Sequence, residues 1–283
     1  MQFKITLKAI ERNSIIPINY QYPISAALYK IIAKGDEQYA EFLHGTGYGR
    51  GFKFFTFSDI NCPFEIKGDR VQLIKDEIFL YVCFHIPETM ESFLKGLFAS
   101  EKIDIADKKS KASFQVLSVE SIPNPLLDYK ENEIVSKLLK PLSPIVAGIP
   151  NERGYDDYLS PDDPRFIENL IYNWRSKIAD CYDGETADGA LLMMEVKEVT
   201  DRKRSNVSKK QQEGRTETKG SIRPKSRLVT IKADTKEETK IRGWINFGLK
   251  VIAERRFVEL LLNGGIGLYN AQGMGALAME ESR

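Results

Sequence analysis

Cysteine and histidine are both scarce in this sequence. Its 283 residues include three cysteines, Cys62, Cys83 and Cys181, and two histidines, His44 and His85. No CxxC pair and no histidine–cysteine cluster occurs, which argues against a structural zinc site and leaves no ligand set for another metal. Because an odd and sparse set of cysteines is typical of a reducing compartment, we expect a cytoplasmic protein.

The sequence also lacks an excess of charge of either sign and lacks long apolar runs. Its 41 lysine and arginine residues are balanced by 40 acidic residues, so any basic surface for nucleic acid must be a local patch. No apolar run approaches the ~20 residues that cross a bilayer. The charged, alternating N-terminal segment is not a signal peptide, so no membrane partner is expected.

The length of 283 residues is sufficient for two domains, and the expected order of helices and strands indicates two domains. The first half is expected to run strand, helix, strand, strand, helix, strand, with a small hairpin inserted around Lys67–Asp69. That order is typical of a ferredoxin-like (RRM-like) unit, and the second half repeats it. Pro123-Asn124-Pro125 is the candidate boundary. We therefore predict an α+β fold with two tandem ferredoxin-like domains, residues 1–123 and 124–283.

Apolar periodicity gives the expected elements of both halves. Strands are expected at 3–7, 52–60, 78–86, 113–122, 134–146, 191–199, 228–232, 241–252 and 276–279. The strand at 134–146 should be broken by Pro141 and Pro144, and the strand at 241–252 should bend near Gly248. Helices are expected at 24–35, at 36–43, from Pro87, from Asp162 and around 257–261. In the strand at 52–60, Lys53, Phe55 and Phe57 should share one face.

The segment 42–60 holds the residue types that phosphate chemistry needs. His44 precedes four glycines and Arg50, and a strand-like run carrying Lys53 follows. Histidine exchanges protons near neutral pH, and a fixed cation meets developing negative charge. The alternative is that His44 only caps a helix and Lys53 is a solvated strand charge. His85 ends a buried strand, and we expect it to be structural.

Basic residues gather in residues 201–227, which we call the basic arm. One interpretation is a solvated, mobile hairpin tip, and the other is an arm that neutralises phosphates; the two are compatible. Its basic residues are Arg202, Lys203, Arg204, Lys209, Lys210, Arg215, Lys219, Arg223, Lys225 and Arg227.

Near the C-terminus, residues 264–275 form a glycine-rich loop with two GxG pairs, Gly265/Gly267 and Gly273/Gly275. The loop lacks the GK[ST] of a Walker A motif, and its setting is not that of a Rossmann loop. It resembles the glycine-rich loop of the repeat-associated mysterious protein superfamily, whose members handle CRISPR RNA. One departure is that residues 268–272 carry no lysine, whereas related loops often do.

The N-terminal half narrows the resemblance. The segments 19–23, 28–29, 42–44 and 52–58 resemble the CRISPR precursor-RNA-processing endoribonuclease, the sixth CRISPR-associated protein family. In that family a tyrosine of the first helix, a histidine at the next helix end and a lysine opening the following strand act together. Tyr29, His44 and Lys53 stand at the matching positions.

The resemblance implies a metal-independent endoribonuclease without a cofactor, which cleaves CRISPR transcripts within repeats and leaves a 2′,3′-cyclic phosphate and a 5′-hydroxyl. His44 would be the general acid or base, Lys53 would stabilise charge and Tyr29 would orient the phosphate or ribose. Repeat RNA is the expected partner of a monomer or homodimer, and other CRISPR effector subunits are candidate partners. The expected RNA contacts are Arg50, Gly265, Gly267, Gly273, Gly275, Lys225 and Arg227.

Two other functions stay open. The first is a non-catalytic subunit that holds guide RNA within a CRISPR effector complex. The second is a general single-stranded RNA-binding module with two RNA-recognition-type domains, which should carry a KGFGFVxF-like pattern on a central strand; the sequence does not contain it.

Overall fold

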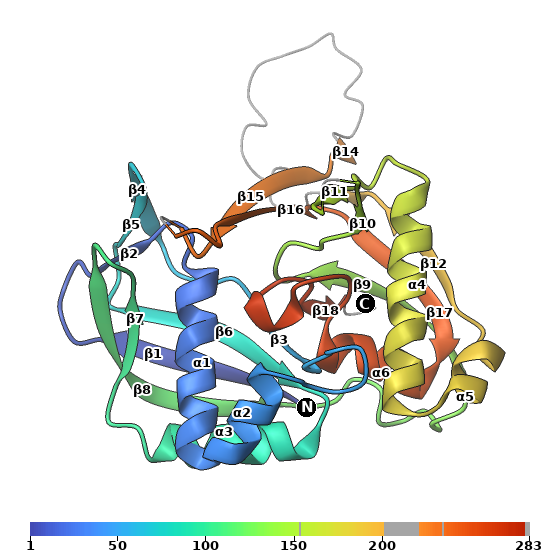
Figure 1. Ribbon diagram of the computed structural model, residues 1–283, viewed down its shortest axis with the longest axis horizontal. Coiled ribbons are helices and arrows are strands. Elements are labelled where there is room, and N and C mark those ends of the chain that lie inside the picture. Colours follow the sequence, from blue (N-terminus) through green and yellow to red (C-terminus); the bar gives the residue numbers. More distant parts are fainter. Residues whose placement is uncertain (153, 201–220, 234, 281–283) are drawn as a thin grey trace, which may run out of the picture.

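Two antiparallel sheets, one from each half of the chain, form the framework of the molecule (Figure 1). The computed structural model describes residues 1–152, 154–200, 221–233 and 235–280. The first sheet has five strands in the order β3-β6-β1-β8-β7, and the second has four in the order β12-β17-β9-β18. Figure 1 shows α1, α2 and α3 over one face of the first sheet and α4 over the second.

The first half supplies the first sheet, three helices and a small separate sheet. Its main elements are β1 (Gln2–Ala9), α1 (Gln21–Gly35), α2 (Glu37–His44), β3 (Phe55–Phe57), β6 (Glu77–Phe84), α3 (Pro87–Phe98), β7 (Ile103–Ala106) and β8 (Lys111–Ile122). The small sheet consists of β2 (Ile15–Pro17), β4 (Phe64–Lys67) and β5 (Arg70–Leu73). The β4–β5 pair is the hairpin that the sequence predicts around Lys67–Asp69.

The second half supplies the second sheet, three helices and several short strands. Its main elements are β9 (Ile134–Pro141), α4 (Arg165–Cys181), β12 (Met193–Lys197), β17 (Gly248–Glu254), α6 (Arg255–Gly264) and β18 (Leu277–Met279). The others are β10 (Gly148–Pro150), β11 (Asp156–Tyr158), α5 (Gly184–Gly189), β13 (Val199–Thr200), β14 (Ser221–Ile222), β15 (Lys225–Ile231), β16 (Thr239–Ile245) and the 3-10 turn η2 (Asn270–Gln272).

The two sheets have corresponding strand orders. In the first sheet β1 lies between β6 and β8, with β3 beyond β6; in the second sheet β9 lies between β17 and β18, with β12 beyond β17. In both, the first strand of the unit therefore lies between the third and the fourth, which is the ferredoxin-like arrangement. The predicted fold class of two tandem ferredoxin-like units is confirmed.

Alternation and helical periodicity place the core residues as expected. Phe3, Ile5 and Leu7 of β1 are buried, while Lys4 between them lies on the other face. Along α4, the apolar stripe from Phe166 to Ile178 is fully buried. The first hydrophobic cluster draws on residues 3–114, and the second draws on residues 126–277 together with Phe54.

Two predicted strands are wrong in extent, and each error lies at a residue with positive φ. The strand expected over 241–252 with a bend near Gly248 is two strands, β16 and β17, because Asn246 has φ 66° and turns the chain between them. The strand expected over 52–60 is reduced to β3, because Phe54 has φ 49° and turns its ring into the second cluster. Lys53 therefore does not continue the face of Phe55 and Phe57.

The remaining boundaries differ by a few residues. β9 ends at Pro141, the first of the two prolines expected to break the strand over 134–146, because the proline ring removes a ladder donor. β15 begins at Lys225, three residues before the predicted start. Among the described residues, no helix is both long enough and apolar enough to cross a membrane.

Candidate active site

A cleft of about 750 Å³ lies between the first half of the chain and the glycine-rich loop. Tyr29, His44, Arg50 and Lys53 line it from the first half, and residues 267–272 line it from the second. Figure 1 shows this last part of the chain, drawn in red around η2, between α1 and α4. The hydroxyl of Ser25 on α1 holds the two sides together by donating to the carbonyl oxygen of Ala271 over 2.7 Å.

His44 is the last residue of α2, and Tyr29 of α1 lies beside it. The carboxylate of Asp36 caps the start of α2 by accepting from the backbone N–H of Tyr39. Gly45 ends the helix and leaves the side chain of His44 exposed. The Tyr29 and His44 rings meet edge to face, with centroids 5.1 Å apart. Burial raises the pKa of Tyr29, so its hydroxyl stays protonated near neutral pH.

Lys53 brings its charge to the same end of α2. Its Nζ donates to the backbone carbonyl oxygens of His44 and Gly45 over 3.2 and 3.3 Å. A cation is favoured at the carboxyl end of a helix, where the last carbonyls have no partner within the helix. Partial burial lowers the pKa of Lys53. The structure thus brings together Tyr29, His44 and Lys53, which the sequence separates by 24 positions.

Arg50 lines the cleft and also ties the loop that follows His44 to α4. Its guanidinium donates to the hydroxyl of Ser176 over 2.6 Å, and its backbone N–H donates to the carboxylate of Asp180 over 2.6 Å. Asp180 packs so closely that a Cβ on Gly49 would lie 2.1 Å from its carboxyl carbon. Both halves of the chain therefore fix the position of Arg50.

The glycine-rich loop is built around the side chain of Asn270. The amide nitrogen donates to the carbonyl oxygens of Ile266 and Met274 over 2.9 and 3.0 Å. Gly265 and Gly275 leave room for this amide, because a Cβ on either residue would lie 2.7 Å from its nitrogen. Their φ angles of 80° and 70° also favour glycine.

The other two glycines of the pairs allow close approach to neighbouring segments. A Cβ on Gly267 would lie 2.2 Å from the carbonyl oxygen of Val146. A Cβ on Gly273 would lie 2.5 Å from the ring of Phe57 in the first sheet. Of the four glycines predicted to contact RNA, only Gly267 is among the residues that line the cleft.

Lys225 and Arg227 lie at the start of β15, away from the residues that line the cleft. Lys225 is exposed, whereas Arg227 forms an ion pair with Asp59 over 2.5 Å. The Asp59 carboxylate also accepts from the Tyr20 hydroxyl and the Gln21 amide, each over 3.1 Å. Residues 201–220, the larger part of the basic arm, lie outside the described residues.

The sequence patterns do not mark Lys177 and Asn173 of α4 as site residues. Lys177 is 1% exposed and hydrogen-bonds to the glycine-rich loop, and Asn173 is buried at the wall of the cleft. The amide oxygen of Asn173 has no hydrogen-bond partner within the described part of the chain. Their position in the sequence was the available signal. Both residues fall on the helix stripe that carries Leu170 and Trp174, and a polar side chain on a buried stripe indicates a hydrogen-bonding or functional role.

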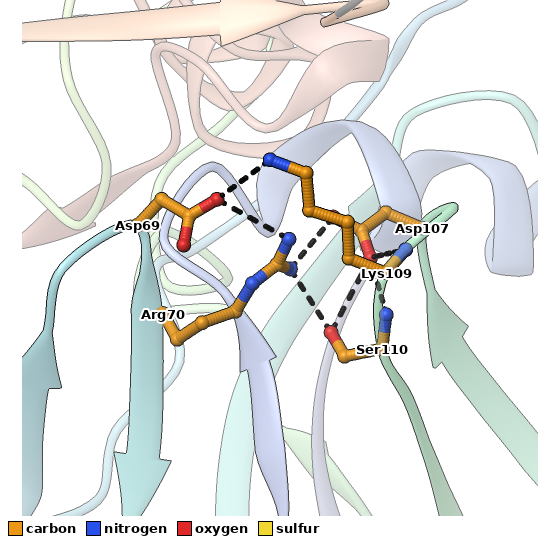
Figure 2. Close-up of polar contacts among 5 residues, drawn as sticks. All are labelled: Asp69, Arg70, Asp107, Lys109 and Ser110. Carbon is orange, nitrogen blue, oxygen red and sulfur yellow. Dashed lines mark hydrogen bonds and ion pairs between the residues drawn. The ribbon is translucent and has the colours of Figure 1, made fainter.

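A second hollow of about 530 Å³ borders the cleft and shares Tyr22 and Lys232 with it. It lies between the β15–β16 hairpin and a polar cluster that joins the β4–β5 turn to the β7–β8 turn (Figure 2). In that cluster Arg70 donates to Asp107 over 2.6 Å, and the Lys109 ammonium lies 3.0 Å from Asp69. Acidic and basic side chains are mixed along this hollow.

His85 lies outside the lining of the cleft, and its structural role stays a prediction. Its ring is half-buried, with its centroid 6.1 Å from that of Phe54, and burial lowers its pKa to about 4. Within the described ranges, no three histidine, cysteine, aspartate or glutamate side chains come close enough together to hold a metal ion.

Two family models match consecutive parts of the chain. Residues 15–117 match the model described as CRISPR-associated protein Cas6, N-terminal, and residues 127–279 match that described as CRISPR associated protein Cas6, C-terminal. The second match alone covers more than half of the chain. The chain belongs to the Cas6 family. The resemblance seen in the sequence is therefore confirmed at the level of the family.

Individual Cas6 relatives agree with this assignment. The chain is 30% identical over 174 residues to CRISPR-associated endoribonuclease Cas6 1 of Methanocaldococcus jannaschii, a match that spans 60% of this chain and 63% of that relative. Among solved structures, a CRISPR associated protein Cas6 is 22% identical with a TM-score of 0.67, and the match covers 99% of both chains. A Cas6-related protein from Pyrococcus furiosus is 18% identical with a TM-score of 0.74, over 100% and 99% of the two chains. These structures share the fold.

Proposed function

We propose that this chain is an endoribonuclease that cleaves CRISPR precursor transcripts within their repeats and releases guide RNAs. The observation that carries the proposal is the cleft in which Tyr29, His44 and Lys53 face the glycine-rich loop. Membership of the Cas6 family and the similarity to a relative named as an endoribonuclease support it. The sparse cysteines suit a reducing cytoplasm, where we expect the reaction to take place.

The reaction needs only groups that the RNA, the side chains and solvent water supply. The 2′-oxygen of one nucleotide attacks the adjacent phosphorus, and the bond from phosphorus to the 5′-oxygen breaks. The products are a 2′,3′-cyclic phosphate and a 5′-hydroxyl. One proton leaves the 2′-hydroxyl and one reaches the 5′-oxygen. His44 carries out one of these two proton transfers, as general base toward the 2′-hydroxyl or as general acid toward the 5′-oxygen. Solvent water accepts or supplies the proton of the other transfer.

Lys53 and Tyr29 act on the phosphate itself. The Lys53 ammonium lies within hydrogen-bonding distance of the last carbonyls of α2 and would turn to the non-bridging oxygens as they gain charge. The Tyr29 hydroxyl, kept protonated by its raised pKa, donates a hydrogen bond that orients the phosphate or the ribose. Arg50 and the loop residues 267–272 hold the adjoining RNA.

The decisive experiment uses RNA with the CRISPR repeat of the organism that encodes this chain. The purified protein is incubated with the end-labelled RNA in excess EDTA, and the product ends are analysed. We expect a single cut, a 5′-product that ends in a cyclic phosphate and a 3′-product that begins with a 5′-hydroxyl. Cleavage that stops in EDTA and returns with Mg²⁺ would contradict the metal-independent mechanism.

The non-catalytic alternative predicts a different result in the same experiment. A guide-RNA-binding subunit would retain the labelled repeat RNA in a gel-shift assay and leave it intact, with or without metal. Binding without any cleavage, across a tenfold excess of protein and both metal conditions, would favour that function.

A further inference from the structure

Lys177 is a fully buried lysine that no step of the proposed reaction uses. It lies on α4, and its side chain reaches the underside of the glycine-rich loop. Its Nζ donates to the carbonyl oxygens of Gly265 and Gly267 over 2.8 and 3.4 Å and to the side-chain oxygen of Asn270 over 2.6 Å. These three bonds use all three ammonium donors, and every acceptor is uncharged.

The same lysine touches the segment that carries the proposed catalytic residues. Its Nζ lies 5.6 Å from the centroid of the Phe52 ring, next to Lys53 in the chain. Its neighbours on α4, Ser176 and Asp180, bind Arg50. This face of α4 therefore supports both walls of the cleft.

The hydrogen bonds of Lys177 hold the loop, but its buried charge costs folding free energy. Moving an ammonium group out of water is costly, and a buried charge without a carboxylate partner recovers little of that cost. Burial lowers the pKa of Lys177 to about 7, because desolvation disfavours the charged form. An apolar side chain of similar length would avoid this cost but would leave the three loop acceptors without their donor, whereas a ligand of opposite charge near the loop would offset the cost.

A polyanion in the cleft would offset the cost of burying the Lys177 charge. Residues 264–275 contain no lysine or arginine, yet they provide six consecutive residues of the cleft wall, 267–272. A phosphate against this wall would meet backbone and uncharged side chains. Directly behind the wall lies the Lys177 ammonium, in surroundings where little water screens its charge.

We propose that Lys177 is a positioning residue for RNA: its ammonium holds the glycine-rich loop in the shape that lines the cleft and adds the positive charge that the loop sequence lacks. The inference rests on the proposed function, because it takes RNA as the occupant of the cleft. Lys177 itself reaches the RNA only through the loop.

The test compares affinity with cleavage in the variant Lys177→Met, which keeps the chain length and removes the charge and the donors. Affinity is measured with the repeat RNA that carries a single 2′-deoxy nucleotide at the mapped cut site, and cleavage with the unmodified RNA at saturating enzyme. We expect the Kd to rise about tenfold or more, since the variant cannot form hydrogen bonds from a charged donor. The cleavage rate at saturation should change by less than about threefold, a difference below one order of magnitude in rate.

Arg175→Met is the matched control on the same helix. Arg175 also donates to backbone carbonyls, those of Ala187, Asp188 and Ala190 around α5, which lies away from the cleft lining. Its loss should lower the melting temperature and leave the Kd for RNA unchanged. An equal rise in Kd for both variants would overturn the proposal, because the effect would then be general destabilisation.

Asn270→Ser is a second variant that leaves Lys177 in place and removes its side-chain acceptor, together with the two hydrogen bonds that the Asn270 amide donates within the loop. It should raise the Kd in the same way as Lys177→Met. Wild-type affinity in either folded variant, or loss of the cooperative melt in both, would overturn the positioning role. If the wild-type protein neither binds nor cuts the repeat RNA, the proposed function fails instead, and the two failures are thereby distinguished.

Discussion

At the scale of single residues, His44 decides between an enzyme and a binding protein. It is exposed at the end of α2 and lines the cleft, so its removal should not disturb packing. We expect His44→Ala to lower the single-turnover cleavage rate roughly 10²–10⁴-fold, the range for losing a general acid or base. RNA affinity and melting temperature should stay close to wild type. The rate is measured at saturating enzyme, with affinity measured separately.

Two companion variants make the His44 result specific. Lys53→Ala should also slow cleavage and should weaken binding, because its charge faces the ground-state phosphate as well. His85→Ala is the control; its half-buried ring packs near Phe54, so it should change stability and spare the rate. If His44→Ala cuts as fast as wild type, the catalytic assignment is wrong and the binding function takes its place.

The sequence could predict some site residues because their chemistry is visible in a short segment. His44 and Lys53 flank one glycine-rich segment, and Tyr29 follows from the family resemblance. No role was predicted for Lys177 and Asn173, because the buried stripe of a helix is recognised by its apolar residues and the polar residues within it give no signal. The Gly265 carbonyl oxygen, which accepts a hydrogen bond from Lys177, lies 88 positions away, beyond any local pattern.

At the scale of elements, order and type were predictable, and so was the break at Pro141, whereas the turns at non-glycine residues of positive φ were not. Periodicity gave the strands and helices of both sheets, since burial of one face dictates the period. The errors at 52–60 and 241–252 come from Phe54 and Asn246, which adopt positive φ inside apolar runs. Such a turn depends on which sheet each flanking strand joins, and that is a tertiary property.

The glycine-rich loop should tolerate no added side chain at its tight positions. Gly267→Val would push a Cβ against the Val146 carbonyl oxygen, and Gly273→Val would push one against the Phe57 ring. Both residues also have φ near 70–80°, where valine is strained. We expect RNA affinity to fall in both variants while the first unit keeps a cooperative melt. Gly184→Val, at a position with open space, is the control.

The size of the two glycine effects should differ. The neighbour of Gly267 is backbone, which cannot move aside, whereas the neighbour of Gly273 is a side chain. Gly267→Val should therefore lose more affinity in a direct binding titration. If either variant abolishes the melt of the whole protein, the loop is needed for folding and its role in RNA binding is not supported.

The β15–β16 hairpin is attached to the first unit by the ion pair between Asp59 and Arg227. Asp59→Ala would leave the Arg227 guanidinium and the Tyr20 hydroxyl without their acceptor. We expect the free energy of unfolding to fall by about 1–3 kcal/mol, the usual effect of removing a charged hydrogen-bond partner. Chemical denaturation measures it.

An exposed ion pair provides the comparison. Glu195 and Lys197 lie 2.5 Å apart on β12 with both side chains well exposed. Glu195→Ala should leave the free energy of unfolding close to that of wild type, because solvent screens such pairs. Equal effects of the two substitutions would show that the Asp59–Arg227 ion pair adds nothing beyond a surface pair.

At the scale of the whole molecule, the cleft exists only because the two halves meet. Ser25 and Ala271, which are 246 positions apart, share a hydrogen bond across it, and α4 of the second unit binds Arg50 of the first. The proposed boundary at Pro123–Pro125 falls between β8 and β9, so the site would be divided between the two domains. Sequence patterns gave the two units separately; the arrangement that joins their surfaces depends on long-range contacts that no local pattern encodes.

The whole chain has almost no net charge, so a positive surface that attracts RNA must come from a local cluster of basic residues, and residues 201–220 are the candidate. Residues 201–220 carry seven of the lysine and arginine residues and lie outside the described part of the chain. The strands β13 and β14 pair Thr200 with Ser221, so a two-residue Asn-Gly turn can replace the segment between them. If these side chains neutralise phosphates, the deletion should weaken repeat-RNA binding and flatten the plot of log affinity against log salt. The slope should fall by about 0.7 for each phosphate of single-stranded RNA that the shortened protein no longer neutralises.

Cleavage at saturating RNA should survive the deletion, because Tyr29, His44 and Lys53 lie in the cleft and are untouched. The control is a variant that keeps the full length of the wild-type chain and replaces the seven basic residues of 201–220 by serine or glutamine. It should reproduce the flattened slope, since counterion release depends on charge and not on chain length. If both proteins keep the salt slope of wild type, residues 201–220 do not neutralise phosphates. The positive charge that attracts RNA would then belong to the residues of the cleft.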